Sequence, residues 1–95
     1  MVEDNCPGEN GYCLTSKGFD QNNGVIKLNS LDSNTRERKL NCLKLCRALS
    51  NAIGCEVIWG QSNRGCYAHT QNIATGNGVD RHHCWMFSKC EAGLK

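Results

Sequence analysis

The stretch that decides the fold runs from residue 42 to residue 66 and reads Cys42-Leu-Lys-Leu-Cys46-Arg-Ala-Leu-Ser-Asn-Ala-Ile-Gly-Cys55-Glu-Val-Ile-Trp-Gly-Gln-Ser-Asn-Arg-Gly-Cys66. Cys42 and Cys46 are one helical turn apart in a segment with helical periodicity, so both sulfurs lie on one face of a predicted helix. Cys55 and Cys66 follow on two short extended segments that a glycine-containing turn joins. The simplest arrangement ties one helix to a hairpin by two disulfides.

The cysteine content of the whole chain supports a disulfide framework. A chain of 95 residues predicts a single domain, residues 1–95. A domain of this size has only a small core, so it benefits from covalent crosslinks. It has eight cysteines, an even number, and no Cys-x-x-Cys spacing that would indicate a zinc ribbon or a thioredoxin-type motif. We therefore expect a secreted protein or one in the lumen of an oxidising organelle. The eight predicted disulfide residues are Cys6, Cys13, Cys42, Cys46, Cys55, Cys66, Cys84 and Cys90.

Charge and hydropathy exclude two classes of partner. A formal net charge of +2 is too small to predict nucleic-acid binding, and no apolar run approaches the length of a membrane span. The basic residues of the predicted helix (Arg36, Lys39, Lys44 and Arg47) could meet an acidic glycan or protein, although such charges usually form a solvated face.

Periodicity predicts one helix, over residues 35–52. Asn34 and Glu37 have the spacing of a capping box before it, and Gly54 is suited to end it. The apolar positions follow a 3.6-residue period. They are Cys42, Leu45, Cys46, Leu49 and Ile53, with Leu40 and Leu43 at the margins.

Short extended segments surround this helix. Alternating and β-prone residues predict strands at 11–16, 25–31, 55–60, 65–70 and 81–90. Residues 1–10 are expected to be an irregular lead-in, and residues 71–80, which are rich in Asn and Gly, a mobile loop. The resulting class is α+β, a small disulfide-rich domain in which one α-helix packs across an antiparallel sheet.

The Cys-x-x-x-Cys helix, the Gly-Cys that follows it and the Gly-Cys-Tyr of the next strand resemble a PAN/apple domain, over roughly residues 13 to 90. The resemblance implies a twisted antiparallel sheet crossed by one helix, with Cys46 bonded to Cys55 and Cys42 to Cys66. It also implies a bridge between the terminal regions. This chain has cysteines for two such bridges, and a nested Cys13–Cys84 and Cys6–Cys90 pairing is the one we expect, although spacing alone leaves every pairing open.

The strand pattern also predicts which side chains face the helix. If Val57 faces it, then Glu56 and Ile58 face away, and we expect Cys84 and Met86 to face in. An apolar patch would then form on the opposite face of the sheet from Ile58, Tyr67, Trp85 and Phe87. Alternatively, residues 1–31 fold over this face and bury it, which we favour because a small domain needs that core.

Binding is a better-supported function than catalysis. No nucleophile or phosphate-binding motif is present, and every cysteine is better used in a bridge. A metal site at His82, His83 and Cys84 is disfavoured, because neighbouring strand residues point to opposite faces. We expect no cofactor and no metal. The candidate binding residues lie in turns and on the outward face: Asn63, Arg64, Tyr67, His69, Asn77 and Trp85.

The resemblance implies an extracellular recognition or adhesion module for a protein or carbohydrate ligand. Two other classes remain open. The chain may instead serve as a structural subunit that docks through its apolar sheet face in a larger assembly, or as a small secreted effector or inhibitor.

Overall fold

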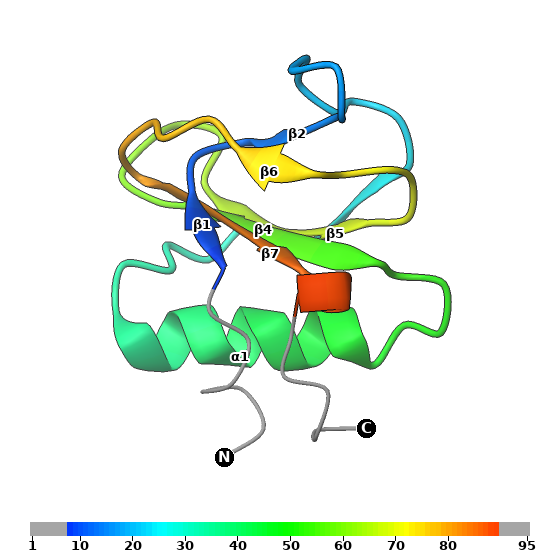
Figure 1. The fold of residues 1–95 in the computed structure, drawn as a ribbon. Coiled ribbons are helices and arrows are strands. Elements are labelled where there is room, and N and C mark those ends of the chain that lie inside the picture. The colour runs from blue at the N-terminus through cyan, green and yellow to red at the C-terminus, as the bar shows by residue number, and fades with distance from the viewer. Residues whose placement is uncertain (1–7, 90–95) are drawn as a thin grey trace.

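The computed structural model describes residues 8–89, and in these residues the predicted α+β class is confirmed (Figure 1). The main sheet is antiparallel, with strand order β1-β7-β4-β5-β3, and β2 pairs with β6 in a separate two-stranded sheet. Helix α1 lies along one face of the main sheet, and the β2–β6 pair lies over the other face (Figure 1). The elements are β1 (Glu9–Asn10), β2 (Cys13–Leu14), β3 (Val25–Asn29), α1 (Arg36–Arg47), β4 (Gly54–Ile58), β5 (Gly65–His69), β6 (Thr75–Gly76), β7 (His82–Met86) and a 3-10 turn (Phe87–Lys89).

The helix is shorter than its apolar pattern predicts. It begins after Thr35, whose hydroxyl accepts a hydrogen bond from the Arg38 amide at 3.2 Å, so Thr35 and not Asn34 is the N-cap. It ends at Arg47. A helix that continued to residue 52 would carry the chain roughly 9 Å beyond Cys46. Only two residues would then remain to return Cys55 to its 5.8 Å Cα distance from Cys46.

The face that α1 buries is also displaced from the expected one. Cys42, Leu43 and Cys46 are buried, whereas Leu45 is 46% exposed. Lys39 lies on the same face, because residues 39, 42, 43 and 46 follow the i, i+3, i+4, i+7 spacing. Its Nζ sits 4.0 Å from the centre of the Trp59 ring, a cation–π contact at the rim of the core.

Strand β4 is the centre of the sheet, and all five of its residues are buried. It pairs with β5 on one side and with β7 on the other. Gly54 begins the strand instead of capping the helix, and a Cβ at this position would lie 2.5 Å from the carbonyl oxygen of Trp85. Glycine is therefore required here by the close approach of β7.

The predicted orientation of β7 is wrong. Cys55 pairs with Trp85 and Glu56 with Cys84, so Trp85 faces the helix and Cys84 faces away from it. Trp85 is 4% exposed and belongs to the core with Cys55 and Val57. The expected apolar patch that included Trp85 does not form.

The second face of the sheet is covered, as we favoured from the sequence, but residues 71–80 contribute to the cover. Strand β2 pairs with β6 in the register Cys13 with Gly76 and Leu14 with Thr75. Between this pair and β7, the side chains of Cys13, Cys84 and Met86 form a small second core. Ile73 packs against it. The stretch predicted to be a mobile loop is thus partly a strand that pairs with the N-terminal segment.

Three disulfides connect these layers. Cys42–Cys66 and Cys46–Cys55 join α1 to β5 and β4, and Cys13–Cys84 joins β2 to β7 on the opposite face. The first two are the pairs that the PAN/apple resemblance implies, and Cys13–Cys84 is the terminal bridge that we expected among the possible ones. The expected Cys6–Cys90 bridge lies outside the described residues.

Candidate functional site

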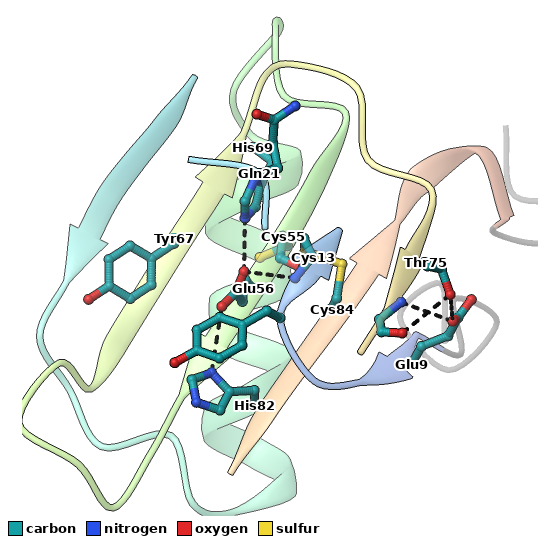
Figure 2. Close-up of a disulfide and its surroundings, with 12 residues drawn as sticks. Glu9, Cys13, Gln21, Cys55, Glu56, Tyr67, His69, Thr75, His82 and Cys84 are labelled. Carbon is teal, nitrogen blue, oxygen red and sulfur yellow. Dashed lines mark hydrogen bonds and ion pairs between the residues drawn. A yellow bond between two sulfur atoms is a disulfide. The ribbon is translucent and has the colours of Figure 1, made fainter. Parts of the chain in front are cut away.

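A buried carboxylate lies on the sheet face that is turned away from the helix. Glu56, in the middle of β4, is 6% exposed. Its Oε1 accepts hydrogen bonds from the backbone amide of Cys13 at 3.2 Å and from Nε2 of His69 at 3.0 Å (Figure 2). Three strands position these groups, because β2 brings Cys13 over β4 while His69 lies on β5. These bonds supply donors to one oxygen of a glutamate that lies between two core residues.

His82 approaches the other oxygen of this carboxylate. Nδ1 of His82 is 3.6 Å from Oε2 of Glu56 (Figure 2), which is too long for an ordinary hydrogen bond and makes the contact mainly electrostatic. The Gln61 amide nitrogen can only donate, so it donates to Nε2 of His82 at 3.0 Å. This places the proton of His82 on Nδ1, toward Glu56. The ring of Tyr12 covers His82, with centroids 3.9 Å apart.

The hydrogen-bond inventory also sets the form of His69. Its Nε2 must carry a proton to donate to Glu56, while its Nδ1 is buried and has no partner among the described residues. The bond from Nε2 to Glu56 is therefore the side-chain hydrogen bond that orients this ring.

An open cavity of about 190 Å³ adjoins this cluster. The N-terminal segment contributes Tyr12, Asp20 and Gln21 to its walls, and the main sheet contributes Glu56, Tyr67 and His69. Figure 2 shows Gln21 next to His69, and Tyr67 to one side of Glu56. The Tyr67 hydroxyl donates to the carbonyl of Asn63 at 2.6 Å, which fixes that wall. A space of this size is below the roughly 300 Å³ of typical ligand pockets, so it suits one small group and not a large molecule.

The structure brings three of the predicted binding residues together at this cavity: Asn63, Tyr67 and His69. His69 was expected beside Tyr67 on an outward face. It does face away from the helix, but it is only 1% exposed because the N-terminal segment covers it. Sequence reasoning missed Tyr12, Gln21 and Glu56. Glu56 was correctly placed on the face turned away from the helix, but no role was assigned to it, although a carboxylate flanked by core residues was a signal.

The other predicted binding residues lie elsewhere. Arg64 is exposed and borders a separate open depression with Asp32 and Gly60. Trp85 is in the core and offers no surface for a ligand. Asn77 holds the chain in place, since its Oδ1 accepts from the amides of Tyr12 at 2.9 Å and Val79 at 3.0 Å. The stability of the domain should therefore respond to substitution of Asn77, which we had expected from the sequence to be a binding residue.

The described cysteines are arranged as disulfides and not as metal ligands. The sulfurs of Cys42, Cys46, Cys55 and Cys66 lie within 4.8 Å of one another, but they are bonded in two pairs. Oxidised sulfur does not supply the thiolates that zinc binds. His82 and His83 are neighbours on β7 and point to opposite faces of the sheet. Cys84, the next residue, is bonded to Cys13 and cannot ligate a metal as a thiolate.

A second polar contact holds the N-terminal segment. Glu9 accepts hydrogen bonds from Nζ of Lys89 at 2.9 Å, from the hydroxyl of Thr75 at 2.7 Å and from the amide of Gly76 at 3.1 Å (Figure 2 shows Glu9 beside Thr75). These bonds, that of Lys89 foremost, lower the pKa of Glu9 to about 2. Its partners belong to β6 and to the turn after β7, so Glu9 ties together three segments that are distant in the sequence.

Comparison of the chain with protein-family models, with curated proteins and with solved structures finds no match. The structure therefore supports the coarser description, a small disulfide-rich α+β domain. The three disulfides within residues 8–89 indicate an oxidising compartment. In residues 8–89, the one α-helix is too short and too polar to cross a membrane.

Proposed function

We propose that this protein is a secreted recognition module of the PAN/apple type, which binds a protein or carbohydrate ligand without catalysis. The observation that carries the proposal is the cavity above Glu56. Its walls combine two tyrosine rings with amide and carboxylate groups, as sites that orient a small polar group do. The Glu56 cluster and the Cys13–Cys84 bridge fix these walls before a ligand arrives, which reduces the entropy lost on binding.

The chemistry of the walls favours binding over catalysis. The lining has no serine, threonine or free thiol that could act as a nucleophile, since the sulfur of Cys13 is bonded to Cys84. Oε1 of Glu56, moreover, already accepts two hydrogen bonds from the protein. These bonds hold the carboxylate in one orientation, which suits a fixed binding contact.

The test is a binding screen with matched variants. A glycan array and a pull-down of interacting proteins would first be run with the intact protein. Any ligand found should bind Gln21→Ala and Asn63→Ala more weakly, since both side chains line the cavity. Arg64→Ala is the matched control, because Arg64 neighbours Asn63 but lies outside the cavity. A ligand whose affinity falls with Arg64→Ala but not with the cavity variants would place recognition elsewhere and contradict the proposal.

A structural subunit is a second candidate, although through a different surface from the one expected. Within the described residues β3 is one of the two edge strands of the main sheet, and it exposes 37% of Val25 and 40% of Ile26. Edge strands with exposed apolar residues are prone to pair with another chain. Light scattering after size exclusion distinguishes the candidates: a stable monomer at high concentration disfavours self-assembly through β3.

A further inference from the structure

We infer that the cavity above Glu56 binds the side-chain ammonium group of a lysine presented by a protein partner. This inference rests on the proposed recognition function and names the chemistry of its ligand. It depends on the charge of the cluster, on the groups that line the cavity and on the cavity's size.

No lysine or arginine of the described residues pairs with Glu56. Its ion-pair contacts there are to His69 at 3.0 Å and to His82 at 3.6 Å. The glutamate is only 6% exposed. A buried carboxylate without a lysine or arginine partner favours a positive group in the open space beside it.

The cavity walls add acceptors and no cation. Asp20 supplies a second carboxylate. An ammonium group has three N–H donors and no acceptor, so it matches a lining of this kind. The rings of Tyr12 and Tyr67 offer π-faces to the same cation. The ring of Tyr67 already contacts one cation from outside the cavity, since Nζ of Lys27 lies 5.6 Å from the ring centre.

A neutral sugar would use the same tyrosines and amides, but it would leave the charge of Glu56 uncompensated. Size points the same way, because 190 Å³ accommodates the end of one side chain more readily than a branched glycan. The described residues therefore favour a lysine over a carbohydrate, and sugar binding becomes an outcome of the test.

The experiment titrates the intact, oxidised protein with Nα-acetyl-lysine methylamide and with its Nε-acetylated form, followed by NMR shifts or calorimetry. The charged probe should bind saturably at millimolar concentrations, and the neutral form about tenfold more weakly. Glu56→Gln and Asp20→Asn should each weaken the charged probe several-fold, while Lys27→Gln should strengthen it by removing a like charge. Glu37→Gln is the matched control: it removes one carboxylate from the exposed face of α1, on the opposite side of the sheet.

Each result decides the inference. Equal affinity for the two probes, or no saturable binding of the charged one, overturns it. If Glu56→Gln fails to fold, Asp20→Asn at the exposed rim still tests the charge requirement. A parallel titration uses methyl glycosides of neutral hexoses. A sugar that binds while the charged probe does not would overturn the lysine inference and leave the recognition function standing. If neither the lysine probes nor the glycosides bind, the inference is overturned, and this cavity is also removed as the proposed recognition site.

Discussion

Replacing Cys13 and Cys84 together with alanine should destabilise this domain more than the same change at Cys46 and Cys55. The Cys13–Cys84 bridge closes a loop that spans 71 positions, whereas Cys46–Cys55 spans 9. The Cys42–Cys66 bridge shortens the longer loop. With Cys6 and Cys90 replaced by alanine in both variants, so that no terminal bridge shortens the loop further, its effective length is the 29 positions from Cys13 to Cys42 plus the 18 from Cys66 to Cys84, or 47 in all.

Loop-closure entropy converts these lengths into about 4 kcal/mol for Cys13–Cys84 and about 2.6 kcal/mol for Cys46–Cys55. The expected difference is about 1.5 kcal/mol, which in a domain of this size corresponds to roughly 6–12 °C in Tm. All four cysteines are buried, so the loss of packing from the missing sulfurs is similar in the two variants and largely cancels.

The assay is urea denaturation of both double variants, monitored by near-UV circular dichroism and analysed by linear extrapolation. Intact-mass measurement before and after alkylation verifies that the remaining bridges have formed. Equal losses of unfolding free energy, or a larger loss for the Cys46–Cys55 variant, would refute the loop-closure argument. Local packing would then matter more than the length of the closed loop.

Three further substitutions test other parts of the structure. Because the folded pKa of Glu9 is depressed to about 2, its contribution to stability is present above its unfolded pKa and is lost as pH falls from about 4.5 toward 2. Glu9→Gln should therefore flatten that part of a curve of Tm against pH. An unchanged curve would show that the contact with Lys89 contributes nothing to stability. Asn77→Ala should cost about 1–2 kcal/mol of unfolding free energy, because two backbone amides lose their acceptor. Arg64→Ala is the control and should leave Tm unchanged. Equal Tm values for the two variants would contradict the assigned role of Asn77. Trp85→Ala should lower the unfolding free energy by about 3–5 kcal/mol, because it leaves a cavity against the helix. Denaturant titration measures this loss. A loss below about 1 kcal/mol would mean that the Trp85 ring lies outside the core.

The sequence was sufficient to predict the helix, the β4–β5 hairpin and the face of α1 that carries Cys42 and Cys46. Those features depend on local signals, namely the helical period and the β-prone residues on either side of the turn. The orientation of β7 was mispredicted because we assumed that Cys84 faces the helix as Cys55 does. Its sulfur instead pairs with Cys13 in the second layer, and this inverts every side chain of the strand.

The candidate site could be predicted only in part. Asn63, Tyr67 and His69 were selected by their place in a turn and on an outward face, which the pairing of β4 with β5 determines. The buried glutamate could not be recognised, because its partners are contributed by residues that are distant in the sequence. The Cys13 amide arrives from β2, 43 positions away, through contacts that leave no periodic pattern in the chain. The pairing of β2 with β6 escaped prediction for the same reason.

The central claim is that two disulfides fix α1 to the β4–β5 hairpin, and tryptic mapping of the native protein without reduction tests it most directly. Cleavage after Lys44, Arg47 and Arg64 separates the four cysteines into different peptides. We predict one species that joins the Cys42 peptide to the Cys66 peptide, and another that joins the Cys46 peptide to the Cys55 peptide. Recovery of Cys42 and Cys46 as alkylated free thiols from unreduced protein would contradict the account.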